Sequence, residues 1–246
     1  MSTDEERLDV LLRERGLTRS RSRAKSRIMA GDVYVDDEQV DKAGTRVPVD
    51  AEIELRGDAN PYASRGGLKL DAAMENFDLD VDERTAIDVG ASTGGFTDYL
   101  LQHGTEHVYA VDVGYGQLAW KLRRDDRVTA IERTNIREMD EDALDEPCDL
   151  AVVDCSFISL ELVLPNTLPF LTDSADIVAL IKPQFEAGPD QVGDGGVVRD
   201  EAIRRETIKE VFRMAEVELD LERKGSVDSD VHGPSGNIEH FAWWRR

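Results

Sequence analysis

The chain has few cysteines and no long apolar run. Only Cys148 and Cys155 are cysteine, and their spacing fits neither a disulfide framework nor a paired zinc site. No run of about eighteen apolar residues occurs, and the charged first 25 residues do not resemble a signal peptide. We therefore expect a cytoplasmic protein with reduced thiols, no metal and no membrane partner.

Lysine is also scarce, whereas acidic residues are abundant. Seven of the 30 basic residues are lysine, and the 52 acidic residues give a formal net charge of −22. This charge alone argues against a nucleic-acid partner, because an acidic surface repels a polyanion. A strongly acidic, lysine-poor surface also predicts a halophilic protein that is adapted to high internal salt.

One segment carries the opposite charge. From Arg7 to Arg27 there are eight bases and two acids, a local net charge of +6, so the remainder carries about −28. In so acidic a protein, phosphate contact is favoured over a merely solvated charged face. The segment therefore predicts a surface that contacts nucleic-acid phosphates through Arg19, Arg21, Arg23, Lys25 and Arg27.

Sequence periodicity divides the chain into a small and a large domain. Leucines at helical spacing predict a helix over residues 6–15, and a second helix is expected from a cap at Thr18 to about residue 30. Short alternating apolar runs over residues 33–55 predict a small β unit. The expected organisation is a small α+β domain over 1–57, a linker over 58–63 and a larger domain over 64–246.

In the larger domain, short apolar runs alternate with helical stretches, which predicts a Rossmann-like α/β fold with a mostly parallel, seven-stranded sheet. The expected strands are 85–89, 107–111, 128–131, 150–153, 177–181, 217–223 and 238–244. The expected helices are 67–76, 96–103, 117–123, 160–171 and 201–215. Because no helix separates the last two strands, we expect them to pair antiparallel at the sheet edge. One of Trp243 and Trp244 should pack inward.

A glycine-rich turn follows the first of these strands. After Gly90 the next glycine is Gly94, which differs from the dinucleotide fingerprint. An acid in the strand and a wide turn suit a ligand without phosphates, such as S-adenosylmethionine, and an acid ending the next strand can accept ribose hydroxyls. A helix cap is the alternative for that acid. The expected cofactor residues are Asp88, Gly90, Ala91, Ser92, Thr93, Gly94, Gly95, Phe96, Asp112 and Asp154.

Asp154 and Lys182 directly follow two further strands of the sheet. Both side chains should emerge at the carboxyl edge, where ligands bind in such folds. A lysine after a buried apolar run needs a partner, because an isolated interior charge is costly, and Asp154 is suitably placed. The alternative is an ordinary interior ion pair.

Several separated motifs together resemble the TlyA, or haemolysin A, family of rRNA ribose 2′-O-methyltransferases. They are Arg7–Leu55, Ser64–Leu70, Asp88–Thr97, Asp154–Ser159, Lys182–Glu186 and Gly236–Glu239. The resemblance covers nearly the whole chain and implies an αL-type RNA-binding domain followed by an FtsJ-like domain. It also implies methyl transfer from S-adenosylmethionine to a ribose 2′-hydroxyl, of a cytidine, in rRNA or ribosomal subunits.

The resemblance also implies a lysine–aspartate–lysine–glutamate tetrad, at Lys69, Asp154, Lys182 and Glu239. A ribose hydroxyl is a poor nucleophile, so a site must hold it in line with the methyl group and help remove its proton. We expect Lys182 to touch the hydroxyl, either as a neutral base or as a positive steering group, while Asp154 orients it. Arg65, beside the tetrad's first lysine, either clamps an RNA phosphate or lies on a solvated face.

Three other functions remain as alternatives. A non-catalytic RNA-binding or ribosome-assembly factor could keep the cofactor fold without using it, although the intact tetrad argues against this. A membrane-active haemolysin would need a span or a basic amphipathic helix, and neither is evident in the sequence. A base methyltransferase is disfavoured because Lys182 stands where an amine-methylating motif has asparagine.

Overall fold

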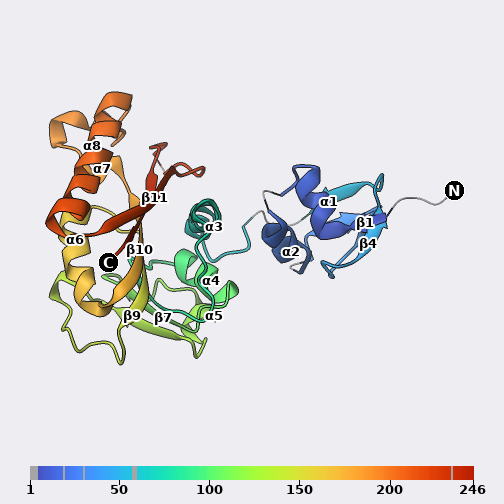
Figure 1. The fold of residues 1–246 in the computed structure, drawn as a ribbon, viewed down its shortest axis with the longest axis horizontal. Coiled ribbons are helices and arrows are strands. Elements are labelled where there is room, and N and C mark those ends of the chain that lie inside the picture. The colour runs from blue at the N-terminus through green and yellow to red at the C-terminus, as the bar shows by residue number, and fades with distance from the viewer. Residues whose placement is uncertain (1–4, 19, 30, 57–59, 234) are drawn as a thin grey trace. The chain divides into compact units, whose positions relative to one another are not determined.

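The chain divides into two compact units, residues 1–61 and 62–246. The computed structural model describes residues 5–18, 20–29, 31–56, 60–233 and 235–246 (Figure 1). The positions of the two units relative to each other are not determined, so each is described by itself.

The first unit has two helices that pack on short strands. Its elements are β1 (Glu5–Arg7), α1 (Leu8–Glu14), α2 (Arg21–Met29), β2 (Val33–Val35), β3 (Glu38–Gln39), β4 (Arg46–Pro48) and β5 (Ile53–Leu55). The described strands form a β1–β4 pair and a sheet in the order β3-β2-β5. Leu8, Leu12 and Ile28 are fully buried between helices and strands. The predicted α+β fold is therefore confirmed.

Two predicted boundaries in the first unit are wrong. The first helix was predicted to begin at residue 6, but it begins at Leu8, because Glu6 lies in β1 and pairs with Val47 of β4. Thr18 does not cap the second helix, since its hydroxyl donates to the carbonyl of Ser20, 3.2 Å away. The Ser20 hydroxyl instead accepts the amide of Arg23 at 3.1 Å, and the helix begins at Arg21.

The second unit is a Rossmann-like sheet with helices, as predicted. Its strands are β6 (Thr85–Val89), β7 (His107–Asp112), β8 (Val128–Glu132), β9 (Cys148–Val153), β10 (Leu171–Ile181), β11 (Glu222–Asp228) and β12 (His240–Arg245). Its α-helices are α3 (Arg65–Phe77), α4 (Gly95–Gln102), α5 (Trp120–Arg123), α6 (Leu160–Thr167), α7 (Pro183–Glu186) and α8 (Glu201–Arg213). The strand order is β11-β12-β10-β9-β6-β7-β8 within the described residues, and β12 runs antiparallel to both of its neighbours.

The predicted edge pair is present, but one of its strands was predicted too early. Residues 217–223 were expected to form it, whereas helix α8 continues through a π-helical turn, Met214–Glu218, and β11 begins at Glu222. Met214 and Ala215 are buried with Val211 of α8, so helical packing outweighs the apolar alternation after residue 216.

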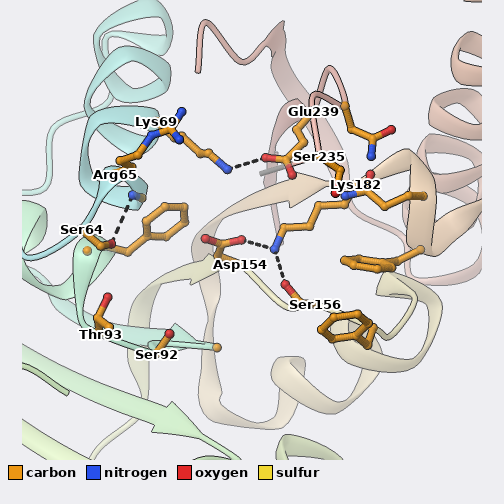
Figure 2. A pocket seen from close by; sticks show the side chains of 18 of the residues that line it. Ser64, Arg65, Lys69, Ser92, Thr93, Asp154, Ser156, Lys182, Ser235 and Glu239 are labelled. Atoms are coloured by element: carbon orange, nitrogen blue, oxygen red, sulfur yellow. Dashed lines mark hydrogen bonds and ion pairs between the residues drawn. The ribbon is translucent and has the colours of Figure 1, made fainter. Parts of the chain in front are cut away.

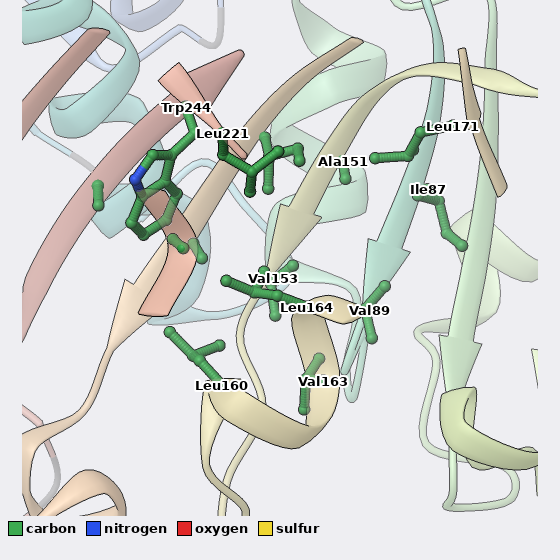
Figure 3. Close-up of a cluster of buried hydrophobic side chains, with 14 of the residues drawn as sticks. Ile87, Val89, Ala151, Val153, Leu160, Val163, Leu164, Leu171, Leu221 and Trp244 are labelled. Atoms are coloured by element: carbon green, nitrogen blue, oxygen red, sulfur yellow. The ribbon is translucent and has the colours of Figure 1, made fainter. Parts of the chain in front are cut away.

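Apolar side chains cover both faces of the central strands. On one face, Val89 and Val153 pack with Leu160 and Leu164 of α6 (Figure 3). Trp244 is fully buried in the same cluster, which confirms that one tryptophan packs inward. Strands buried on both faces are typical of parallel sheets. This rigid core fixes the carboxyl ends of β6, β9 and β10, where the polar loops emerge.

Candidate active site

A cavity of about 810 Å³ opens at the carboxyl edge of the sheet. Its wall combines the glycine-rich turn after β6, the start of α3, the loops after β9 and β10, and the segment before β12. Among the predicted residues, the lining includes Arg65, Lys69, Asp88, Gly90, Ala91, Ser92, Thr93, Gly95, Phe96, Asp154, Lys182 and Glu239.

The first half of the predicted tetrad is an ion pair between Lys182 and Asp154. The Lys182 Nζ lies 2.6 Å from Asp154 Oδ1 and donates a hydrogen bond of 2.8 Å to the Ser156 hydroxyl (Figure 2). Parallel pairing of β9 with β10 brings the loops that carry these groups side by side. Lys182 is only 7% exposed, so both partners serve to keep its charge stable away from water.

The other two predicted tetrad residues, Lys69 of α3 and Glu239 directly before β12, form a second ion pair. Lys69 projects from α3, whose start is capped by the Ser64 hydroxyl, and its Nζ lies 2.5 Å from Glu239 Oε2. Both side chains are buried, and Glu239 is 1% exposed. Figure 2 shows the two ion pairs close to each other, and all four residues line the same cavity. The structure therefore brings all four predicted catalytic residues together.

The turn after β6 approaches the catalytic loop so closely that only glycine fits. Gly90 has φ +89°, and a Cβ there would lie 2.8 Å from the Asp154 carbonyl oxygen. Asp88, one strand residue earlier, is fully buried, and its Oδ2 accepts both the amide and the hydroxyl of Thr97 at 2.9 and 2.6 Å. Its Oδ1 has no hydrogen-bond partner among the described residues. A buried, unpaired carboxylate oxygen beside a cavity fits the ammonium group of an amino-acid ligand.

Burial raises the pKa of Asp88 to about 7, reinforced by the negative charge of Asp154 and opposed by the hydrogen bonds from Thr97. Because a cationic ligand requires the carboxylate, we expect S-adenosylmethionine affinity to fall as the pH drops below 7, approaching tenfold per unit. Calorimetry between pH 5.5 and 8.5 tests this, with Asp88→Asn as the control that flattens the profile. Affinity unchanged over this range would contradict the expected role. Without ligand, the same raised pKa should make the folded protein gain stability as the pH falls from 7 towards 4.

Two predicted cofactor residues lie outside the cavity lining. Asp112 uses its two oxygens to accept the amides of Ser92 and Gly114, at 2.8 and 2.6 Å, so it holds the turns beside the cavity. Gly94 has φ +90° and packs against Leu122, where a Cβ would be 2.2 Å from a methyl group. Contact of Asp112 with ribose hydroxyls stays a prediction.

The predicted RNA-binding residues divide by exposure. Arg21 is 48% exposed and bonded to the buried Asp9 at 2.9 Å; Arg23 is partly buried, and Lys25 is exposed. Arg27 does not fit the prediction, because it is buried and paired with Asp32 at 3.1 Å.

Arg19 and Arg65 were also predicted to contact RNA. Arg19 lies outside the described residues. Arg65 is exposed at the cavity, where its guanidinium group lies 3.5 Å from the carbonyl oxygen of His232. This contact is too long to fix the guanidinium, so Arg65 can still reach a phosphate.

Sequence reasoning assigned no role to three residues of the cavity wall. Ser156 binds Lys182, and Phe157 is 90% exposed with φ +64°, its ring 4.9 Å from that of Phe185. An exposed aromatic ring at the cavity could contact a flat ligand group. The signal in the sequence was an aromatic residue three positions after a strand-end acid, a pattern that also fits a core residue. Among the described residues, no group of three or more His, Cys, Asp or Glu could hold a metal ion.

Comparison with known proteins identifies the family. The profile of the FtsJ-like methyltransferase family matches residues 62–246, and that of the S4 domain matches residues 6–53. The 16S/23S rRNA (cytidine-2′-O)-methyltransferase TlyA of Mycobacterium tuberculosis is 47% identical over 97% of this chain and 89% of its own length. The chain belongs to the TlyA family of FtsJ-like methyltransferases. It is therefore an S-adenosylmethionine-dependent methyltransferase, as predicted.

Two further TlyA-family proteins support this assignment. YqxC of Bacillus subtilis, which is named as an rRNA methyltransferase, is 45% identical over 99% of this chain and 88% of its own length. A solved Streptococcus thermophilus protein described as a hemolysin is 44% identical, covers 100% of this chain and 90% of its own, and superposes with a TM-score of 0.74. Both relatives span the RNA-binding and catalytic units together.

Proposed function

We propose that this TlyA-family protein transfers a methyl group from S-adenosylmethionine to the ribose 2′-hydroxyl of an rRNA nucleotide, a cytidine. The observation that carries this proposal is the convergence of two lysine–carboxylate pairs on one cavity beside the unpaired oxygen of Asp88. The name of the Mycobacterium tuberculosis relative supports the cytidine and the rRNA substrate.

The residues of the cavity suggest how the hydroxyl is activated. Asp88 and the backbone after Gly90 would hold the amino-acid end of S-adenosylmethionine, which would supply an electrophilic methyl group. Lys182 donates a hydrogen bond to Ser156 and forms an ion pair with Asp154, and its ammonium group has a further proton that can reach the ribose oxygen. That contact would hold the oxygen in line and stabilise the negative charge that develops on it. As the O–CH3 bond forms and the S–CH3 bond breaks, the hydroxyl proton would pass to solvent. Lys69 and Glu239 line the same cavity, where they orient the sugar.

A transfer assay followed by mapping tests the proposal. Wild-type protein should move the tritiated methyl group of S-adenosylmethionine onto rRNA within ribosomal subunits, and alkaline hydrolysis should leave the modified linkage uncut. Absence of transfer would favour a non-catalytic assembly factor, while a modified linkage that still cleaves would favour base methylation. Liposome leakage would instead favour the haemolysin alternative. No helix within the described ranges is long and apolar enough to cross a membrane.

We also propose that the first unit binds rRNA through phosphate contacts of Arg21, Arg23 and Lys25. Changing Arg21 and Lys25 together to alanine should weaken RNA binding and make the slope of log affinity against log salt shallower by about 2. Filter binding at several KCl concentrations measures both. Arg213→Ala on α8 removes one exposed charge from the other unit and should leave the slope unchanged. An unaltered slope in the double variant would refute phosphate contact at these positions.

We also propose that the protein is cytoplasmic and halophilic. The net charge of −22 creates self-repulsion that salt screens, so the melting temperature should rise by several degrees from 0.1 M to multimolar KCl. Thermal unfolding followed by circular dichroism measures the trend. A flat or falling curve would count against halophilic adaptation.

A further inference from the structure

In the second unit, the loop after β9 and the segment after β10, which contains α7, are linked by more than the Lys182–Asp154 ion pair. Residues 154–159 follow β9, and residues 182–186 follow the neighbouring strand β10. The contacts between them are Lys182 with Asp154 and Ser156, Phe157 with Phe185, and Glu186 with Ser159 and Leu160. The last of these contacts lies farthest from the reacting groups, and the mechanism above does not use it.

Both oxygens of Glu186 are engaged by the loop after β9. Oε2 accepts the Ser159 hydroxyl at 2.6 Å, and Oε1 accepts the Leu160 amide at 2.9 Å. The Ser159 oxygen in turn accepts the amide of Glu161 at 3.1 Å, so it is fixed between Glu186 and the start of α6. Burial raises the pKa of Glu186, and the bonds from Ser159 and Leu160 oppose that rise.

The loop that Glu186 holds contains a strained residue. Phe157 has φ +64°, in the left-handed region that a non-glycine residue occupies only when its surroundings impose it. The loop is fixed at its first end by the Asp154 amide, which donates to the carbonyl of Val89 at 3.0 Å. Its other end is fixed by Glu186. Ser156 lies between these two anchors, and its hydroxyl accepts a proton of Lys182.

We propose that Glu186 is a positioning residue for methyl transfer, which acts by latching the Ser156-bearing loop to the segment that carries Lys182. The latch sets where the Ser156 hydroxyl stands and thereby which way the remaining proton of Lys182 points. Without it, the strain at Phe157 relaxes and Ser156 moves away from the ammonium group. This inference rests on the proposed function only for its kinetic part, because the latch itself is a property of the folded chain.

Two variants of Glu186 and one matched control test the latch. Glu186→Ala should lower kcat about 10- to 100-fold while S-adenosylmethionine affinity stays within about threefold, because a displacement near 1 Å suffices for such a loss. Glu186→Gln keeps an oxygen that can accept the Leu160 amide, so its kcat should fall clearly less than that of Glu186→Ala. Glu161→Ala removes the same charge from an exposed position beside Glu186 and should leave kcat unchanged.

Hydrogen exchange and a double-mutant cycle separate positioning from mere stability. Glu186→Ala should speed amide exchange over residues 156–162, and Glu161→Ala should not. In a Ser156→Ala background, adding Glu186→Ala should cost little further kcat, since the group it positions is gone. Unchanged exchange, kcat within threefold of wild type, or full additivity with Ser156→Ala would each overturn the proposal. If the wild type transfers no methyl group, the proposed function fails, and exchange alone still decides whether the latch exists.

Discussion

Lys182→Ala should abolish methyl transfer, lowering kcat by about 10³-fold or more, while S-adenosylmethionine binding changes by less than about threefold. The buried ammonium group of Lys182 contacts both Asp154 and Ser156. Removing a side chain that assists proton transfer at a reacting oxygen lowers the rate by about 10²- to 10⁴-fold. Single-turnover transfer to rRNA measures the rate, and calorimetry measures cofactor affinity.

A matched lysine elsewhere controls for the change of charge. Lys209 lies on α8 with its side chain 70% exposed and forms a 3.4 Å surface pair with Glu206, so Lys209→Ala should keep full activity. Lys182→Arg keeps the positive charge but replaces a compact ammonium with a planar fork, and it should restore little of the rate. Transfer by Lys182→Ala within tenfold of wild type would remove this residue from the mechanism.

Glu239→Ala should reduce the free energy of unfolding by about 3–5 kcal/mol as well as activity. It leaves the Lys69 ammonium buried without its carboxylate, 2.5 Å away in the wild type, and an uncompensated interior charge costs about that much. Denaturant unfolding gives the stability and the transfer assay gives the rate. In contrast, Glu201→Ala breaks an exposed pair with Arg205 and should barely alter stability.

A double variant separates the two roles of this pair. Lys69→Met combined with Glu239→Gln removes both charges, so most of the lost stability should return while methyl transfer stays low. Recovery of the rate together with the stability would show that Lys69 and Glu239 only support the fold. Wild-type stability in Glu239→Ala would show that the pair contributes nothing to it.

Local sequence signals pointed to two of the four predicted catalytic residues, Asp154 and Lys182. Asp154 and Lys182 end apolar runs that could only be buried strands, so their place at the carboxyl edge followed from topology. Lys69 and Glu239 carry no such signal, and their pairing across 170 residues came from family resemblance alone. The packing of α3 against the sheet brings Lys69 and Glu239 together, and local periodicity cannot predict that packing.

The predictions that failed depended on tertiary partners. Arg27 lies in a basic segment, yet Asp32 draws it into the interior, and composition cannot show that. The strand was expected at 217–223 because apolar residues alternate there. The start of this range instead belongs to a helical turn, Met214–Glu218, which packs with Val211. Ser156 was overlooked because its role comes from one hydrogen bond to a lysine 26 residues away.

The ion pair of Lys69 and Glu239 also has a consequence for the order in which this protein becomes active. Chains are synthesised from the N-terminus, and Glu239 lies just before β12, which is inserted between β10 and β11. A nascent chain therefore exposes its RNA-binding unit and its cofactor turn long before the catalytic cavity is complete. The proposed methyl transfer therefore cannot begin before the chain has been synthesised through β12 and this strand has paired with β10.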